Sequence, residues 1–444
     1  MSRLKVCLVG GGSYNWGPGL LNDMMLKKDI PDIDFYLLDI NLDAAKDIAA
    51  FGAFLNSKYG TNDRFFPTTN RKLAFSGAGQ IIITITTGGL DSMGKDLVIP
   101  EKYGIFHTVG DTVGPGGWSR AIRNIPIFAE FGRDIAKYAP DAFVLNYTNP
   151  NTVCTKTLST VAPKQKVVGL CHNLFGTYDT LKKIFNLDSE KDISVVSAGV
   201  NHFYWLIDFK IKGEPGYKLL KEKLGKKKIW QFMNELYGRE TVSRAMSELY
   251  DVYGYVTDFH DRHLCEFFNK YITPTGKRLK EYRIVRTYIH ERRKWVKDAK
   301  QYVIDVIKGK KVFDRGASRE SCASILDTMA TGKEFMDVVN VPNRGQVENL
   351  PEGAVLETLG IVDRQGFRPI NVGRMPDELV PTVLPHAINQ NMIVEAVLEG
   401  NVNKAFKALA NDPVNAHLTL KQVKAMGTEL LKAQRELLPK AFKI

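Results

Sequence analysis

Short apolar runs alternate with longer amphipathic stretches through the first half of the chain. Six runs have the length of a strand, and they cover residues 5–9, 34–38, 80–84, 142–145, 167–170 and 193–200. Strand-length runs separated by helical patterns are typical of βαβ units, which build a parallel sheet with helices on both faces. The pattern therefore predicts an α/β domain, with the sixth run extending or flanking its sheet.

Beyond Trp205 the pattern changes to long, charged segments with helical periodicity. The clearest of these cover residues 227–250, 278–307, 389–398 and 418–438. We expect residues 1–195 to form a first domain and residues 196–444 to form a second, α+β domain. No internal repeat or low-complexity linker separates the two halves of the sequence, so we expect the domains to pack closely on each other.

The composition is that of a soluble globular enzyme, with 44% hydrophobic and 25% charged residues among 444. The net charge is +12, but the basic residues are spread along the chain, which favours solubility or an anionic small molecule over nucleic acid. No apolar run is long enough to span a bilayer. The five cysteines form neither a CxxC pair nor a disulfide framework. These features predict a cytoplasmic protein that binds neither nucleic acid nor membrane.

A glycine-rich turn follows the first predicted strand. Residues 10–13 (GGGS) stand where a helix begins, and Asp39 ends the second predicted strand. Glycines let the backbone approach a pyrophosphate at a helix N-terminus, and the acid accepts hydrogen bonds from a ribose, which favours NAD over NADP. Asn15 replaces the third glycine of the usual motif, so a tight turn without a ligand stays open. The predicted cofactor-binding residues are Gly10, Gly12, Ser13, Asp39 and, after the third predicted strand, Thr87 and Gly88.

Two polar clusters each follow a predicted buried strand. Cys171 stands after the fifth run, and His202 stands after the sixth. Because open α/β sheets bind ligands at the carboxyl ends of their strands, we expect this thiol and this imidazole to lie side by side there. Either residue alone is more typical of a protein interior. Together they indicate a metal site with open coordination positions, which suits catalysis, and the chemistry leaves zinc, iron and manganese open.

Six motifs stand in the order found in glycoside hydrolase family 4, which the chain resembles. They are residues 10–13 (GGGS), 86–89 (TTGG), 111–117 (DTVGPGG), 146–150 (NYTNP), 169–172 (GLCH) and 199–202 (GVNH). The resemblance is continuous over the first two hundred residues and looser beyond them. It implies a Rossmann-like NAD-binding domain, related to the lactate and malate dehydrogenases, followed by an α+β domain. This family is the NAD-dependent exception to glycoside hydrolysis by two carboxylates.

The resemblance also implies a reaction by elimination. NAD oxidises the sugar 3-hydroxyl to a ketone, a divalent metal polarises the ketone, a base removes the proton on carbon 2, and the glycosidic oxygen leaves. Water then adds and the ketone is reduced. Without a Lewis acid the carbon 2 proton is too weakly acidic for a side chain to remove. By the resemblance, Cys171 and His202 hold the metal, expected to be Mn²⁺. Asn149 holds the sugar hydroxyls, and Asp111 is an acid beside the site.

The resemblance places the catalytic base in the second domain. Members of the family use a tyrosine or an aspartate there, which makes Tyr253, Tyr255 and Asp261 the candidates. Arg262 is a candidate for binding charge on the substrate. The alternative is that residues 258–263 form a charged loop that pairs with itself.

The residue after the metal cysteine separates branches of the family that the chain resembles. An acid there is associated with phospho-α-glucosidases, an asparagine with phospho-β-glucosidases, and a histidine with non-phosphorylated α-glycosidases. His172 therefore predicts a substrate without a 6-phosphate, and residues 171–177 (CHNLFGT) look most like the α-galacturonidase and α-glucuronidase branch. We expect His172 and Asn201 to contact the sugar. The α-galactosidases and α-glucosidases stay open as alternatives.

Two other classes share part of this pattern. A 2-hydroxy acid dehydrogenase has the fold and NAD but uses a His–Asp pair in place of a cysteine ligand. A non-catalytic NAD sensor ignores metal, so the pairing of Cys171 with His202 speaks against both classes. By resemblance to the family, we expect a homodimer or homotetramer that acts on a small glycoside.

Overall fold

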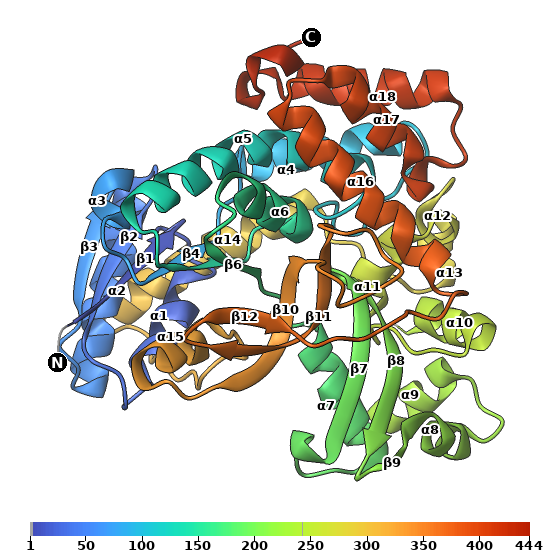
Figure 1. The fold of residues 1–444 in the computed structure, drawn as a ribbon, viewed down its shortest axis with the longest axis horizontal. Helices are drawn as coiled ribbons and strands as arrows, with labels where there is room; N and C mark the ends of the chain where they lie inside the picture. The colour runs from blue at the N-terminus through green and yellow to red at the C-terminus, as the bar shows by residue number, and fades with distance from the viewer. Residues whose placement is uncertain (1–2, 242) are drawn as a thin grey trace.

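One continuous sheet runs through the molecule (Figure 1). The computed structural model describes residues 3–241 and 243–444, and within them the sheet has twelve strands. Their order is β3-β2-β1-β4-β5-β6-β10-β11-β7-β8-β9, with β12 paired to β11. The strands are β1 (Leu4–Val9), β2 (Ile33–Leu38), β3 (Arg64–Thr68), β4 (Gln80–Ile83), β5 (Phe143–Asn146), β6 (Lys166–Gly169), β7 (Ile193–Val200), β8 (Phe203–Ile211), β9 (Glu214–Pro215), β10 (Phe335–Pro342), β11 (Val355–Asp363) and β12 (Gly366–Pro369).

The first six strands are parallel and carry the predicted α/β pattern. Their order, β3-β2-β1-β4-β5-β6, is that of a doubly wound dinucleotide-binding fold. The central strand β4 is buried along its whole length, which is why it reads as a continuous apolar run. All six predicted runs form strands, so the α/β prediction is confirmed. The pattern does not reveal β3, because this edge strand contains Pro67 and is only partly buried.

Helices cover the sheet, and their ends follow the capping rules. The side chain of Asn41 accepts the N–H of Ala44 at the start of α2, and Gly60 ends this helix with a φ of 69°. The helices are α1 (Gly17–Met25), α2 (Leu42–Tyr59), α3 (Arg71–Phe75), α4 (Gly89–Glu101), α5 (Gly114–Tyr138), α6 (Asn151–Val161), α7 (Asn173–Phe185), α8 (Gly216–Leu224), α9 (Ile229–Tyr237), α10 (Arg244–Tyr253), α11 (Asp261–Leu264), α12 (Asn269–Ile272), α13 (Lys277–Glu281), α14 (Ile289–Ile307), α15 (Cys322–Thr331), α16 (Val380–Leu398), α17 (Val402–Asn411) and α18 (Leu420–Ala433).

The helical segments predicted in the second half are mostly correct but contain breaks. Residues 227–250 fold as α9 and α10, because Gly238 ends α9 with a φ of 61°. Residues 278–307 fold as α13 and α14, separated by residues 282–288. The two C-terminal segments fall mainly in α16 and α18; Figure 1 shows α18 in red at the top of the molecule and α16 in orange-red sloping down below it.

The second half of the chain adds strands to the sheet of the first half. β10 pairs with β6 through Asn340 and Gly169, and β11 then joins β10 to β7. The second half is therefore a mixed α+β region, as predicted, and it packs directly on the first. The expected domain boundary at residues 195 and 196 falls inside β7. The division into two domains stays a prediction.

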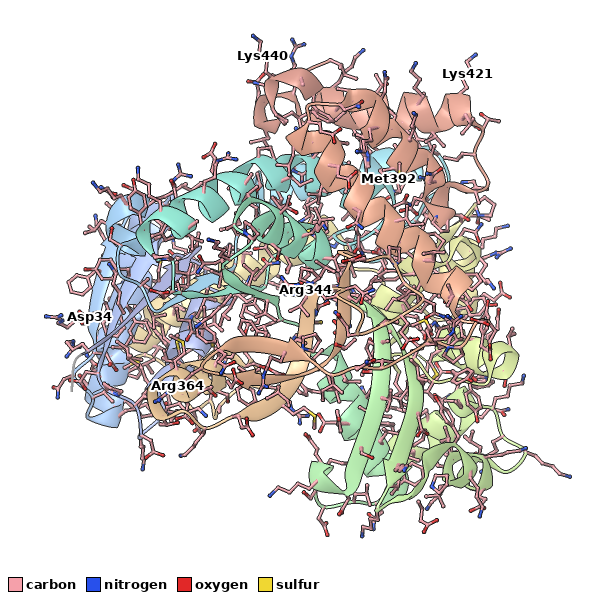
Figure 2. All side chains as sticks on the ribbon, viewed as in Figure 1. Asp34, Arg344, Arg364, Met392, Lys421 and Lys440 are labelled. Carbon is pink, nitrogen blue, oxygen red and sulfur yellow. The ribbon has the colours of Figure 1, made fainter. Side chains whose placement is uncertain are left out.

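Basic side chains lie on widely separated parts of the molecule. Figure 2 labels Arg364 beside the strands of the second half and Lys421 and Lys440 near the C-terminus. This spread agrees with the absence of one basic block in the sequence. In the described ranges, no helix combines the length and the apolar character that crossing a membrane requires.

Candidate active site

The strand register brings two sequence motifs to one row across the sheet. The row consists of Gly169, Asn340, Glu357 and Gly199. Cys171 and His202 follow the two ends of this row. The strands that they follow are not neighbours, because β10 and β11 lie between β6 and β7. The expectation that the thiol and the imidazole lie side by side stays a prediction. Three strand spacings separate their starting points, a distance on the order of 14 Å.

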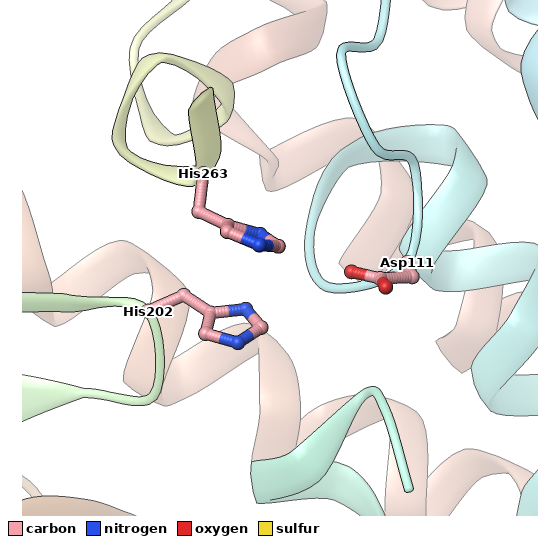
Figure 3. A group of neighbouring side chains, drawn as sticks. All are labelled: Asp111, His202 and His263. Atoms are coloured by element: carbon pink, nitrogen blue, oxygen red, sulfur yellow. The ribbon is translucent and has the colours of Figure 1, made fainter. Parts of the chain in front are cut away.

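Three side chains from three separate segments converge on one space (Figure 3). Asp111 lies in the loop before α5, His202 in the turn between β7 and β8, and His263 in α11. One ligand atom of each lies within 4.8 Å of the others, and the two imidazole rings are 4.0 Å apart. His202 has a φ of 71°, a strained conformation that clusters at functional sites. Imidazole and carboxylate donors in this arrangement suit a divalent metal.

A hydroxyl between Asp111 and His202 determines which nitrogen of His202 can bind a metal. Thr112 Oγ1 donates to Asp111 Oδ1 at 2.8 Å and lies 2.8 Å from His202 Nδ1. Because the only hydroxyl proton goes to Asp111, Thr112 accepts the Nδ1–H of His202. The lone pair of His202 is then on Nε2. Such a contact to the other ring nitrogen is typical of metal-binding histidines.

The charges of the group suit metal binding as well. Burial and the nearby His263 lower the pKa of His202 to about 3, so its imidazole is neutral at physiological pH. Burial by itself would raise the pKa of Asp111, but His263 and Arg120 outweigh it and hold this pKa well below its usual range. A neutral imidazole and an ionised carboxylate are the forms that bind a metal ion.

A cavity of about 430 Å³ joins the glycine-rich turn to this group. We call it the glycine-turn cavity, and its lining includes Gly12, Ser13, Thr84, Ile85, Thr86, Gly89, Asp111, Arg120, Asn149 and Arg292. Asn149 donates to Asp111 Oδ2 at 3.2 Å, and its carbonyl accepts from Arg120 at 2.9 Å. The peptide bond from Asn149 to Pro150 is cis. The predicted sugar-binding residue Asn149 therefore lies beside the candidate metal ligand Asp111.

The glycine-rich turn leaves no space for side chains. A Cβ atom on Gly12 would lie 2.7 Å from the Cβ of Ala44, and Gly10 has a φ of 88°. The N–H of Gly12 donates to Asp39 Oδ2 at 2.9 Å, so Asp39 is fixed against the turn. The backbone of the turn thus borders the cavity directly, which is what a pyrophosphate needs.

The segment before α4 reaches the same cavity. Thr86 and Gly89 belong to the lining, whereas the predicted residues Thr87 and Gly88 between them do not. Gly88 is the N-cap of α4, with a φ of 77°. The motif therefore reaches the cavity, but Thr86 and Gly89 form its wall and the predicted residues Thr87 and Gly88 do not.

A second cavity, of about 650 Å³, opens beside His263. We call it the His263 cavity, and its lining includes His172, Asn173, Phe175, Asp258, His260, Arg262, His263 and Glu320. The exposed His172 has its Nδ1 3.1 Å from Glu320 Oε1. The buried Asp258 accepts from Asn173 at 3.2 Å. Since Asp111 lines the first cavity and His263 lines the second, the metal-ligand candidates lie between the two.

Two arginines in these cavities carry buried nitrogen atoms that have no hydrogen-bond partner among the described residues. They are Nε and Nη2 of Arg292, in the glycine-turn cavity, and Nε of Arg262, in the His263 cavity. Burial lowers the pKa of Arg292, while Asp111 raises it. A guanidinium does not lose its charge in a protein. Because buried polar groups normally find partners, these two favour an anionic ligand.

Comparison with known proteins agrees with this geometry. A model of the family 4 glycosyl hydrolases matches residues 5–187, and a model of the C-terminal domain of that family matches residues 197–415. The alpha-galacturonidase of Thermoanaerobacter italicus is 32% identical over 98% of this chain and 97% of its own length. The alpha-galacturonidase of Bacillus subtilis is 32% identical over 93% and 94%. The chain belongs to the family 4 glycosyl hydrolases.

Solved structures share the fold of this family 4 glycosyl hydrolase. The structure of lplD from Bacillus subtilis has a TM-score of 0.87 at 29% identity and covers 97% of this chain and 100% of its own. A 6-phospho-alpha-glucosidase from gut microorganisms, solved with NAD and Mn²⁺, has a TM-score of 0.81 at 21% identity over 99% of each chain. A lactate dehydrogenase of Cryptosporidium parvum has a TM-score of 0.51 at 14% identity and covers 89% of this chain and 98% of its own. The expected likeness to lactate dehydrogenase in fold is confirmed.

Asp261, one predicted base of this family 4 glycosyl hydrolase, lies against a helix end. It is fully buried, and its two carboxylate oxygens accept the N–H of Ala245 at 2.8 Å and of Met246 at 3.0 Å, in the first turn of α10. Burial raises the pKa of Asp261 to about 7. Asp261 belongs to the lining of neither cavity. Its role as the base stays a prediction that the geometry does not support.

Tyr255, the other predicted base, packs against a neighbouring aromatic ring. Its ring packs edge-on against Tyr217 at 5.9 Å, and burial raises its pKa. A base needs the opposite shift to accept a proton near neutral pH. Tyr255 is also absent from the lining of both cavities. The tyrosine assignment therefore stays a prediction without support from its position.

Cys171 does not join the group of ligand atoms that includes His202. Within the described residues, the atoms that lie within 4.8 Å of one another belong to Asp111, His202 and His263. Burial and the nearby Glu357 raise the pKa of the Cys171 thiol, and the neighbouring side chain of Asn201 opposes this shift. Asn201 in turn donates to Glu357 at 3.1 Å. The role of Cys171 as a metal ligand, and that of Asn201 in sugar binding, stay predictions.

The sequence assigned no individual role to several residues that the tertiary structure brings to the site. They are Thr112, Asp258, His263, Glu266 and Arg292. His263 belongs to residues 258–263, the charged segment that the sequence singled out, so the segment was a usable signal. No spacing rule, however, relates it to Asp111 or His202, because the three residues come from unconnected elements.

Proposed function

We propose that this family 4 glycosyl hydrolase removes an α-linked uronic acid from a glycoside, with an α-galacturonide as the preferred substrate. The observation that carries the proposal is the pair of unpartnered guanidinium groups of Arg262 and Arg292 beside the Asp111 group. A hydrogen bond to a charged group contributes about 1.5–3 kcal/mol, and a guanidinium matches the shape of a carboxylate. Relatives at 31–32% identity over 93–100% of the chain are alpha-galacturonidases.

NAD fits the glycine-turn cavity. The close-packed turn at Gly12 and Ser13 and the carboxylate of Asp39 are the features that a dinucleotide requires. Structures that share this fold contain NAD. When bound, NAD takes up the hydride of sugar carbon 3 and returns it later, so no net oxidation of the sugar results.

A divalent metal, with Mn²⁺ preferred, fits the space between the two cavities. Nε2 of His202, the carboxylate of Asp111 and the imidazole of His263 are nitrogen and oxygen donors, which Mn²⁺ accepts. Cys171 is proposed to approach the same ion from the end of β6. The metal supplies a Lewis acid for the oxygen on carbon 3.

Residues of the chain itself bind and orient the sugar. Asp111 and Asn149 hydrogen-bond each other at the wall of the glycine-turn cavity, where they orient the reacting sugar. Arg292 binds the carboxylate of that sugar from the same wall. Thr112 accepts the Nδ1–H of His202 and so keeps the lone pair of that ring on Nε2. Asp111, Asn149 and Arg292 thus hold the sugar ring while the proton on carbon 2 is removed.

We propose Asp258 as the base that removes this proton. Asp258 belongs to residues 258–263, the charged segment that the sequence singled out. It lines the His263 cavity, whereas Asp261 does not line it. It is 1% exposed, and contacts from Asn173 and the backbone N–H of His260 orient its carboxylate. A positioned carboxylate with restricted access to water is a suitable general base.

Assembly, location and domain division stay parts of the proposal. The first family match ends at residue 187 and the second begins at residue 197, which supports a boundary near residue 195. The five cysteines are free, which is typical of a reducing compartment and supports a cytoplasmic enzyme. The homodimer or homotetramer rests on the family resemblance.

The test is a screen of p-nitrophenyl α-galacturonide, α-glucuronide, α-galactoside and α-glucoside with NAD, Mn²⁺ and a thiol reductant. We expect uronides to be cleaved with the highest kcat/KM. Removing either NAD or metal should abolish cleavage, and no NADH should accumulate. Preference for a neutral glycoside would favour an α-galactosidase or α-glucosidase, and stoichiometric NADH would favour a 2-hydroxy acid dehydrogenase.

A variant separates binding of the uronate from general loss of activity. Arg292→Met keeps the length of the side chain but removes its charge. We expect kcat/KM for the α-galacturonide to fall about 10- to 100-fold, as the loss of one charged hydrogen bond predicts. The α-galactoside should lose less, so the preference for the uronide shrinks. An equal loss for both substrates would contradict a carboxylate contact at Arg292.

A further inference from the structure

One buried carboxylate holds the loop that carries Asp111. Glu266 is 1% exposed, and its Oε1 accepts the N–H of Val109 at 2.7 Å and of Gly110 at 2.9 Å. The hydroxyl oxygen of Thr108 lies 3.0 Å from the same oxygen. Two consecutive residues of the loop, directly before Asp111, are therefore bound through their backbone to one side chain from another segment.

Glu266 belongs to the segment that carries His263. It stands three residues after His263, in the short turn that follows α11. A second contact ties the same two segments together, because the hydroxyl of Thr108 donates its proton to the carbonyl of Arg262. The loop before α5 and the turn after α11 are thus connected at two points. These are the elements that supply two of the three candidate metal ligands.

The loop needs such a connection, because its backbone is intrinsically free. Gly110 has a φ of 70° and Gly114 a φ of 66°, so glycines flank Asp111 on both sides. Glycine restricts the backbone less than any other residue. Metal ligands must be held within a few tenths of an ångström to bind well. Something outside the loop must therefore fix the position of Asp111.

We propose that Glu266 is the positioning residue that sets the distance between Asp111 and His263 and thereby determines the affinity of the site for a divalent metal. Glu266 acts through the backbone of Val109 and Gly110 and touches neither metal nor substrate. The inference uses the metal site of the proposed function but does not depend on the identity of the sugar.

A buried carboxylate on backbone N–H groups also stabilises the fold, so the experiment has to separate positioning from stability. Binding of Mn²⁺ to the full-length protein, freed of metal with a chelator, is measured by titration calorimetry for wild type, Glu266→Ala and Glu266→Gln. Binding of NAD to the same samples is the internal reference. Thermal unfolding reports the stability of each variant.

Asp63→Ala is the matched control. Asp63 is also buried and its carboxylate accepts the N–H of Ile33 at 2.6 Å, but it stands directly before β3, at the amino ends of the parallel strands. The candidate site lies at their carboxyl ends. Asp63→Ala should therefore lower the unfolding temperature and leave Mn²⁺ affinity within about twofold of wild type.

For Glu266→Ala we expect Mn²⁺ affinity to fall about 10- to 100-fold, the usual effect of removing a residue that orients ligands, with NAD affinity within about twofold. Glu266→Gln should lose less, because its amide oxygen still accepts the backbone N–H groups. If Glu266→Ala does not fold, the Mn²⁺ affinity of Glu266→Gln tests the proposal. Wild-type Mn²⁺ affinity in both Glu266 variants, or an equal loss in Asp63→Ala, overturns the proposal. Failure to cleave uronides would contradict the proposed function alone.

Discussion

Nδ1 of His202 lies 2.8 Å from the hydroxyl oxygen of Thr112. The two residues come from different elements, the turn after β7 and the loop before α5. Because Thr112 donates its proton to Asp111, it accepts the proton of His202 and leaves the other ring nitrogen free. One hydroxyl therefore orients two candidate metal ligands at once.

Thr112→Val should weaken metal binding without disturbing the fold. Valine has nearly the shape of threonine but cannot bond to His202 or Asp111. We expect Mn²⁺ affinity to fall about 10- to 100-fold, as for other residues that orient a metal-binding histidine. Titration calorimetry measures the change, and Thr112→Ser, which keeps the hydroxyl, is the control. Wild-type affinity in Thr112→Val would show that the contact does not orient His202.

Cys171→Ser should abolish turnover while NAD binding survives. Cys171 does not belong to the lining of the glycine-turn cavity, so the NAD contacts stay intact. Burial and Glu357 raise the pKa of the free thiol, so binding of a metal to Cys171 must release a proton. Turnover and NAD titration on the same sample check the prediction. Near-normal turnover in the variant would end the case for Cys171 as a ligand.

Oxidation provides a second check on the same thiol. If the thiolate of Cys171 takes part in turnover, stored wild-type enzyme should lose activity and recover it with a reductant. Cys265→Ala serves as a comparison, because Cys265 is fully buried and accessible oxidants cannot reach it. Loss and recovery of activity that disappear in Cys265→Ala would identify Cys265, and not Cys171, as the sensitive thiol.

The Glu266 carboxylate should make the fold sensitive to acid. Burial by itself would raise the pKa of Glu266, but His107 and the N–H of Val109 outweigh it and hold this pKa at about 2, against an ordinary value of 4.5. A pKa that is lower in the folded state stabilises the fold above about pH 4.5, and this contribution is lost as the pH falls towards 2. From the shift, it is on the order of 3 kcal/mol.

Urea unfolding of wild type and Glu266→Gln between pH 6 and pH 3 measures this contribution. Wild type should lose free energy of unfolding more steeply with falling pH than Glu266→Gln, because glutamine does not titrate. Other buried carboxylates contribute equally to both curves. Parallel curves would mean that Glu266 has the same pKa in the folded and unfolded states.

Elimination predicts exchange of the hydrogen on carbon 2. A substrate deuterated at carbon 2 and cleaved in ordinary water should yield a product that carries solvent hydrogen there. Direct displacement at the anomeric carbon never breaks that bond. Mass spectrometry of the product distinguishes the two. Complete retention of deuterium would leave the elimination mechanism without support.

The same substrate distinguishes Asp258 from Asp261. Asp258→Asn should abolish both cleavage and exchange. Asp261→Ala should retain exchange but lose about 1–3 kcal/mol of stability, because it leaves the buried N–H groups of Ala245 and Met246 without an acceptor. Loss of exchange in a folded Asp261→Ala protein would restore Asp261 as the base.

The amino-acid sequence by itself determined the parallel half of the fold and the cofactor turn. These features are local, since a buried parallel strand is a short apolar run and a glycine turn is three adjacent residues. β1, β2, β4, β5 and β6 therefore stand where the hydrophobic pattern predicts them, and Gly12 and Ser13 line a cavity. The family likewise follows from short motifs whose order along the chain is visible without a structure.

The candidate metal-ligand group was decided only by the tertiary structure. Asp111, His202 and His263 belong to three elements that no periodicity connects, namely the loop before α5, the turn between β7 and β8, and α11. The sequence paired His202 with Cys171 because each follows a predicted buried strand. Strand order depends on contacts between residues far apart in the chain, and these are established only when the whole sheet has formed.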